Sequence, residues 1–173
     1  MISRPAEAEF APYYGRYVSL VPEPDIAAAM REQVLHVRRV AAVVTLEKET
    51  YRYADGKWSI REVVGHMIDV ERVFGYRAFC ISRKEGAPLP SFDENSYVAQ
   101  SLYDQRPLSD LLEEFAVLRN ANLAFLRRLS DSQWKNVGTA SSSTVSVRAL
   151  VYIMVGHVRH HLNVLRDKYG LSF

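Results

Sequence analysis

Two histidines near the C-terminal end of the sequence have the spacing of metal ligands. His157 and His161 are four residues apart in a long apolar run, so on a helix both imidazoles project from one face, about one turn apart. Imidazoles at this spacing can bind one ion when a third ligand comes from elsewhere in the fold. The best candidate for that ligand is His66, in another strongly helical segment. The sequence therefore predicts a three-histidine metal site.

The donor set narrows the kind of ion. Imidazole ligands suit zinc, nickel, copper or ferrous iron better than magnesium or calcium, so we expect zinc or nickel first, with iron possible. Val158 stands in the place of the catalytic glutamate of the His-Glu-x-x-His motif, and the di-iron bundle pattern of glutamates is absent. Three protein ligands leave one coordination position open, as catalytic zinc sites do.

The other histidines are weaker candidates. His160 lies about 100° around a helix from His161, which makes it a poor fourth ligand for the same ion. His36 falls off the apolar stripe of its own segment and is expected at the surface. The alternative to the metal site is that His157 and His161 are core histidines, each hydrogen-bonded to a buried neighbour.

Length and composition are those of one soluble domain, which we place over residues 1–173. The chain has 48% hydrophobic and 24% charged residues, which are globular proportions. A net charge of +2 is too small to indicate nucleic-acid binding, and no apolar run is long enough for a membrane span. The single cysteine, Cys80, excludes an intrachain disulfide and fits a cytoplasmic protein. The arginines are scattered and suit solvated helix faces, with an anion-binding mouth as the alternative.

Four segments with apolar residues at three- and four-residue steps predict amphipathic helices, over residues 26–45, 60–82, 109–129 and 147–169. Asp25, Ser59 and Ser146 precede three of these segments as N-caps, and Gly170 follows the last. Such helices predict an all-α four-helix bundle over residues 25–170, whose sites are built from side chains on facing helices.

Three less regular segments complete the predicted fold. Residues 1–24 form an irregular arm whose aromatic side chains are expected to lie against the bundle. A long connection, residues 84–107, joins the second and third helices and can hold a short helix capped by Asp93. Residues 138–144 are expected to form a polar loop, and no strand is expected.

The simplest up-down topology makes the second and fourth helices parallel, and His66 and His157 then lie within about one turn of the same depth. Their N-termini would share one end of the bundle, near Trp58 and the 138–144 loop, where helix N–H groups favour an anionic group of a substrate. Arg148, in the first turn of the last helix, is a candidate substrate contact, with a surface salt bridge as the alternative. The 84–107 connection is the next candidate for the entrance.

Several short motifs together resemble the DinB-like superfamily, which includes the bacillithiol transferases and the thiol-dependent maleylpyruvate isomerases. They are Lys57-Trp58-Ser59-Ile60-Arg61-Glu62-Val63, then Gly65-His66, and later Gly156-His157 and His160-His161. The resemblance spans nearly the whole chain. It implies a four-helix bundle, frequently a homodimer, with a divalent ion on three histidines, which in this sequence are His66, His157 and His161. The resemblance does not indicate which substrate this protein uses.

The sequence thus predicts a divalent-metal-binding protein, and specifically a metal-dependent transferase that uses a low-molecular-weight thiol, or a hydrolase. Asp69 is the candidate catalytic residue, as a carboxylate that orients His66 or accepts a proton, although it could equally be a solvent-exposed aspartate. The alternative is a non-enzymatic metal-binding or stress-associated structural bundle. A structural site would be closed by a fourth protein ligand, and the sequence offers none.

Overall fold

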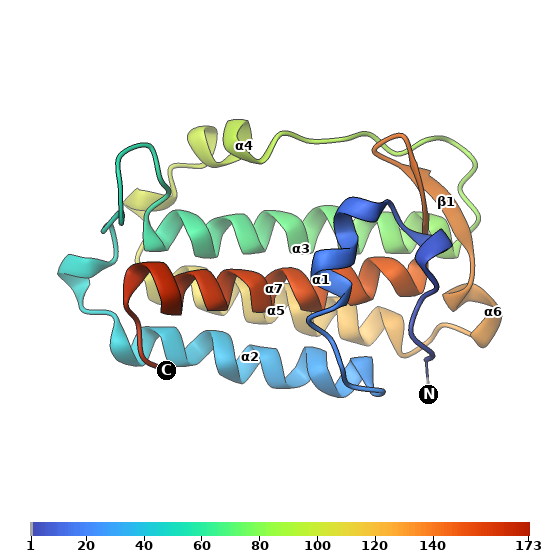
Figure 1. The fold of residues 1–173 in the computed structure, drawn as a ribbon, viewed down its shortest axis with the longest axis horizontal. Coiled ribbons are helices and arrows are strands. Elements are labelled where there is room, and N and C mark those ends of the chain that lie inside the picture. The colour runs from blue at the N-terminus through green and yellow to red at the C-terminus, as the bar shows by residue number, and fades with distance from the viewer. Residues whose placement is uncertain (1) are drawn as a thin grey trace.

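The computed structural model describes residues 2–173 as four long helices packed lengthwise against one another, which confirms the predicted bundle (Figure 1). The long helices are α2 (Ile26–Val43), α3 (Ile60–Ser82), α5 (Leu108–Leu126) and α7 (Val147–Tyr169). Shorter helices are α1 (Gly15–Val18), α4 (Glu94–Ser101) and α6 (Asp131–Trp134), and 3₁₀ turns cover Glu7–Glu9, Pro12–Tyr14, Leu46–Lys48 and Tyr103–Gln105. None of the helices described is long and apolar enough to cross a membrane.

The capping residues set the ends of the long helices. The Asp25 carboxylate accepts from the Ala28 N–H at the start of α2, and the Ser146 hydroxyl accepts from the Ala149 N–H at the start of α7. Ser59 and Glu62 form a reciprocal capping box at the start of α3. Gly170, with φ of 67°, ends α7 in the left-handed conformation that glycine adopts without strain. The predicted starts of α2, α3 and α7 therefore agree with the structure.

The direction of the helices differs from the simple up-down arrangement. At the end of α7, the Tyr169 hydroxyl donates to the carbonyl of Trp58, just before α3 begins. The second and fourth long helices are therefore antiparallel, and the expectation that they run parallel is wrong. In Figure 1, α2 and α7 run one way while α3 and α5 run the other. The connection that contains α4 consequently crosses the whole length of the bundle to join α3 to α5.

A β-hairpin replaces the polar loop expected before the last helix. Strands β1 (Val137–Ala140) and β2 (Ser143–Ser146) pair antiparallel, with Val137 opposite Ser146 and Ala140 opposite Ser143. The turn residues Ser141 and Ser142 both have positive φ, as a two-residue hairpin turn requires. The expectation of no strand was wrong here because this turn lacks the Asn-Gly or Asp-Gly pair that usually signals it.

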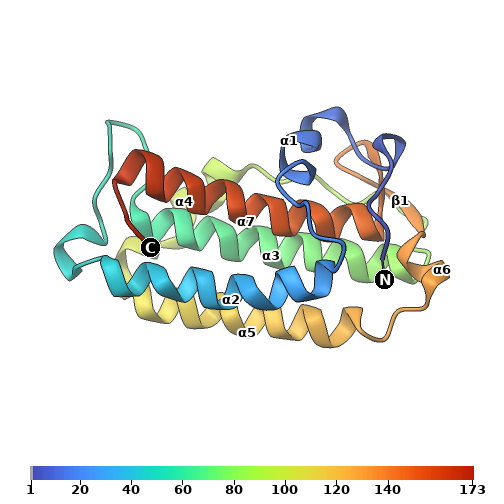
Figure 2. The same ribbon diagram turned by 60° about the horizontal axis from the view of Figure 1, so that its bottom comes forward.

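The N-terminal arm is a chain of short helical turns held against α7, and Figure 2 shows it lying over that helix. Tyr17 and Val18 are buried in this contact. Gly156 of α7 makes the close approach possible, because a Cβ at this position would overlap the backbone carbonyl of Tyr17. The predicted arm is therefore packed on the bundle, as its aromatic content suggested.

A buried polar network ties the four long helices together near their midpoints. The Arg119 guanidinium on α5 donates to both carboxylate oxygens of Glu71 on α3, at 3.0 and 2.8 Å, and to Oε1 of Gln33 on α2, at 2.7 Å. Gln33 in turn donates to the carbonyl of Val155 on α7, at 2.7 Å. Arg119 is 0% and Glu71 1% exposed. The network therefore joins one residue from each long helix within the apolar core.

We expect Arg119→Leu to lower the free energy of unfolding by about 3–5 kcal/mol, because it leaves the buried Glu71 carboxylate without its cation. The matched control is Arg38→Leu, which breaks an exposed ion pair with Glu113 and should cost at most about 1 kcal/mol. Urea unfolding followed by circular dichroism measures both. Equal losses in the two variants would contradict the role assigned to the network.

Candidate metal centre

The three predicted histidines meet inside the bundle. Nε2 of His157 lies 3.0 Å from Nε2 of His66 and 3.0 Å from Nε2 of His161. The three side chains are 5%, 5% and 9% exposed for His66, His157 and His161 respectively. One ring nitrogen from each lies within 4.8 Å of the others. The prediction that these residues come together is confirmed.

The antiparallel packing of α3 and α7 explains the meeting better than the parallel arrangement first expected. The C-terminal end of α7 lies beside the N-terminal end of α3. His66 lies six residues after Ile60, and His161 lies eight residues before Tyr169. At about 1.5 Å per residue these distances along the two helices are roughly 9 and 12 Å. The imidazoles therefore reach nearly the same depth from opposite directions.

The histidine nitrogens are poorly satisfied without a cation. A neutral imidazole has one N–H group and one lone pair, so three Nε2 atoms that face one another cannot all be paired by hydrogen bonds. The Nδ1 atoms of all three rings are buried and have no hydrogen-bond partner within residues 2–173. Ligands of a tetrahedral zinc ion with bonds of about 2.0–2.1 Å are separated by roughly 3.3 Å. The observed spacing and the all-nitrogen donor set fit a divalent transition-metal ion.

Burial keeps the three imidazoles in the neutral form that binds metals. It lowers the pKa of His66 to about 4 and lowers the pKa values of His157 and His161 well below their ordinary value of 6.5. The charged forms of the neighbouring histidines lower these pKa values further. At neutral pH the rings therefore present lone pairs without first losing a proton.

Aromatic rings surround the histidines. The rings of Trp58 and His66 lie 4.7 Å apart between centroids, and Tyr17 meets His157 edge-on at 5.4 Å. A pocket of about 100 Å³ leads from two of the histidines toward the surface, lined by Tyr13, Tyr14, Tyr17, His66, Val70, Phe74, Phe92, Glu94, Ser141 and His157. Its walls come from the arm, α3, the long connection, the hairpin and α7.

The predicted entrance must be corrected in part. Trp58 and the 138–144 segment do not share one end of the bundle, because Trp58 lies at the C-terminal end of α7 and the hairpin leads into its N-terminal end. Ser141 nevertheless lines the pocket, together with Phe92 and Glu94 of the long connection. The sequence did not single out Phe92 or Glu94, although both lie in the connection it marked as an alternative entrance.

Asp69 lies one turn after His66 on α3, but its carboxylate is engaged elsewhere. Oδ1 accepts a hydrogen bond from the Tyr103 hydroxyl at 2.7 Å, and Oδ2 is buried without a partner among the described residues. Burial raises the pKa of Asp69. No hydrogen bond joins Asp69 to His66 within residues 2–173, so the role predicted for Asp69 in orienting that ring stays a prediction.

Arg148 lies outside the pocket at the histidines. Its guanidinium pairs with Glu9 of the arm and contacts the Ser3 hydroxyl, and this pairing lowers the pKa of Glu9 to about 2. This ion pair is the alternative that the sequence analysis gave for Arg148. A contact of Arg148 with substrate stays a prediction. His160 is half-buried beside Tyr17 and is not part of the three-histidine group.

The comparisons with known proteins agree with this fold. The model of the DinB superfamily matches residues 25–165. The chain is similar to the solved structure of YfiT from Bacillus subtilis, described as a probable metal-dependent hydrolase with an unusual four-helix bundle topology. The two share 20% sequence identity and superpose with a TM-score of 0.73, over 97% of this chain and 94% of YfiT. A mycothiol-dependent maleylpyruvate isomerase shares 13% identity with a TM-score of 0.68, over 84% of this chain and 61% of that one. No curated protein matches the chain. At these identities the structural matches establish the fold alone.

For the metal-free protein, we expect the free energy of unfolding to fall as the pH drops from about 6.5 toward 4. Burial lowers the pKa of His66 from 6.5 to about 4, so the unfolded chain binds more protons over this window and acid favours unfolding. His66 alone contributes about 3 kcal/mol, present in full above pH 6.5 and lost as the pH approaches 4. Urea unfolding of chelator-treated protein across this range tests it. His66→Leu should reduce the pH dependence without abolishing it, because burial also lowers the pKa values of His157 and His161.

Gly156→Ala should detach the arm from α7, because the added methyl group overlaps the Tyr17 carbonyl. Overpacking of this kind costs about 1–3 kcal/mol. Hydrogen exchange of residues 13–18 should become faster. Gly86→Ala is the control, since a Cβ there meets nothing within 4 Å. Unchanged exchange in the Gly156 variant would show that the arm can shift without loss of contact.

Proposed function

Because the chain belongs to the DinB superfamily and brings three histidines together without a fourth protein ligand among residues 2–173, we propose that it is a metal-dependent enzyme. The single observation that carries this proposal is the incomplete ligand set. A structural ion is normally closed by four protein ligands, whereas a catalytic ion keeps one position for water or substrate. Here the pocket beside His66 and His157 is the natural place for that open position.

The proposed ion is zinc or nickel, with ferrous iron possible, held by His66, His157 and His161. When bound, such an ion supplies Lewis acidity that lowers the pKa of a water or thiol at its open position. The protein chain therefore needs no nucleophile of its own. Its single cysteine, Cys80, is buried in the apolar core away from the histidine group.

The side chains around the pocket would bind and orient the second reactant. Tyr13, Tyr14 and Phe92 present aromatic surface that excludes water from the approach to the histidines. Glu94 is the one carboxylate among the lining residues, so it is placed to take up the proton released by a nucleophile. The space of about 100 Å³ is smaller than a typical ligand pocket of about 300–1,000 Å³. Only the reactive end of a larger substrate would enter it.

We propose two nucleophiles for this site, a low-molecular-weight thiol and water. YfiT is described as a probable metal-dependent hydrolase, and the maleylpyruvate isomerase as mycothiol-dependent. A hydrolase uses water, and mycothiol is a thiol, so these two descriptions support the proposal of a hydrolase or of a transferase that uses a thiol.

The test begins with the metal content of the purified protein. We expect about one divalent ion per chain in the wild type and little bound metal in His157→Ala or His161→Ala. Each of these substitutions should lower the metal affinity by more than the roughly 10–100-fold that follows when a hydrogen-bond partner of a ligand is removed. His36→Ala is the control, because this exposed residue of α2 lies outside the three-histidine group. Far-ultraviolet circular dichroism should show a helical fold in every variant. Unchanged metal content in both α7 variants would overturn the ligand assignment.

Activity is then measured with the metal-loaded protein against electrophiles with a panel of thiols, and against esters and amides without thiol. Turnover that requires both the ion and a thiol supports the transferase, and turnover that requires the ion alone supports the hydrolase. Either activity should be absent in His157→Ala and retained in His36→Ala. A fully coordinated ion with no turnover in any assay would instead support the non-enzymatic structural bundle.

A further inference from the structure

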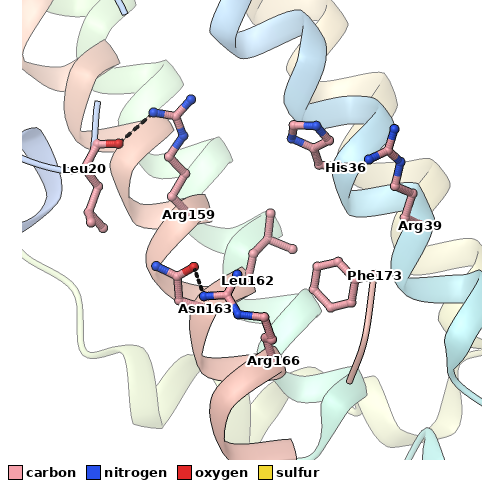
Figure 3. A pocket seen from close by; sticks show the side chains of 8 residues that line it. All are labelled: Leu20, His36, Arg39, Arg159, Leu162, Asn163, Arg166 and Phe173. Atoms are coloured by element: carbon pink, nitrogen blue, oxygen red, sulfur yellow. Dashed lines mark hydrogen bonds between the residues drawn. The ribbon is translucent and has the colours of Figure 1, made fainter. Parts of the chain in front are cut away.

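A second pocket lies between α2 and α7, away from the histidines (Figure 3). Its volume is about 340 Å³, within the usual range of about 300–1,000 Å³ for small-molecule sites. Its lining residues are Leu20, His36, Arg39, Arg159, Leu162, Asn163, Arg166 and Phe173. On α7, Arg159 and Arg166 lie roughly 180–200° around the helix from His157. The pocket is therefore separate from the proposed metal centre.

The charged side chains that line this pocket are arginines. Arg39 comes from α2, Arg159 and Arg166 come from α7, and no aspartate or glutamate is among the lining residues. Figure 3 shows these side chains on two facing walls, with α2 on one side and α7 on the other. Cations gathered in one concave surface repel each other and raise the local concentration of anions.

Arg159 is already neutralised. Its guanidinium donates to the carbonyl of Leu20 at 2.6 Å and to both carboxylate oxygens of Glu23, at 2.7 and 2.6 Å. This pairing lowers the pKa of Glu23. Arg159 is thus a fixed part of the wall. Arg166 also forms an ion pair, with Asp167, and Arg39 is the lining arginine without an ion pair among residues 2–173.

Arg39 and Arg166 keep donors free for a ligand. Arg39 makes no hydrogen bond or ion pair with any residue in the 2–173 range, whereas its neighbour Arg38 is paired with Glu113. Arg166 uses Nη2 for Asn163 and Nε for Asp167, so its Nη1 remains available. Guanidinium groups bind carboxylates and phosphates through paired N–H donors. The two arginines therefore offer an anion site from both walls.

Apolar side chains also line the pocket. Leu162 is 8% exposed, and the Phe173 ring lies near it, between Arg166 and α2 (Figure 3). An inorganic ion would leave this surface in contact with water, whereas an organic body would cover it. A lining with both arginine and apolar side chains favours a molecule with an anionic group and an apolar body.

We propose that this pocket binds a small organic anion, a carboxylate or phosphate monoester on an aromatic or aliphatic body. The anionic group lies between Arg39 and Arg166, and the body packs against Leu162 and Phe173. This site does not depend on the proposed enzymatic activity, because its residues are not shared with the histidine pocket.

Isothermal titration calorimetry of the purified full chain with phenyl phosphate tests the proposal, and phenylacetate in the same assay distinguishes phosphate from carboxylate ligands. We expect one saturable site for at least one of these probes. Arg39→Gln and Arg166→Gln should each weaken binding about tenfold or more, since a hydrogen bond to a charged group contributes that much. Arg38→Gln is the matched control on the same helix and should leave the affinity within about twofold.

Two further comparisons locate the ligand. Inorganic phosphate should bind more weakly than phenyl phosphate, and Phe173→Ala should reduce that difference by removing the apolar contact. His157→Ala should leave binding unchanged, which separates this pocket from the metal centre. The proposal is overturned if neither probe gives saturable binding, if the Arg39 and Arg166 variants bind as the wild type does, or if His157→Ala abolishes binding.

Discussion

Three imidazoles share one buried space in which burial keeps them uncharged at neutral pH, and this constraint governs the surrounding structure. Burial lowers the pKa of each ring. The three Nε2 atoms converge on one another and cannot all be paired by hydrogen bonds, and the Nδ1 atoms have no hydrogen-bond partner within the described chain. Such a cluster costs free energy unless a cation satisfies it. The apolar core on either side of the cluster must hold α3 and α7 in place against that cost.

The buried network of Arg119, Glu71 and Gln33 fixes the alignment of the helices more than it stabilises the fold. Gln33 donates to the carbonyl of Val155, two residues before His157, so the network fixes where α7 lies along the bundle. Slippage of α7 would break this bond and move His157 and His161 past His66. A buried ion pair is weak evidence for stability when compared with an apolar replacement. Its value here is that only one alignment of the four helices satisfies every partner.

The meeting of the three histidines could be predicted from the sequence because helical spacing and helix capping depend on residues close together in the chain. Asp25, Ser59 and Ser146 mark helix starts whatever the tertiary fold, and His157 and His161 share a face of any helix. The direction of a helix within the bundle cannot be predicted in this way, because an apolar stripe has the same pattern in a parallel and in an antiparallel helix. The signal for the antiparallel pair was the 84–107 connection, which is long enough to span α3, roughly 34 Å at 1.5 Å per residue. The second pocket was beyond local reasoning, because Arg39, Arg166 and Phe173 meet only in the folded chain.

The crossover also determines what surrounds the site. Because α3 and α5 run in the same direction, the connection between them must travel back along the bundle, and it passes the mouth of the histidine pocket with Phe92 and Glu94. The opposite wall comes from Tyr13, Tyr14 and Tyr17 of the arm. The three histidines thus lie on long helices, α3 and α7, while much of the remaining pocket lining comes from irregular segments. Such segments tolerate substitution better than helix cores do, so the lining of this pocket can change without disturbing the three histidines.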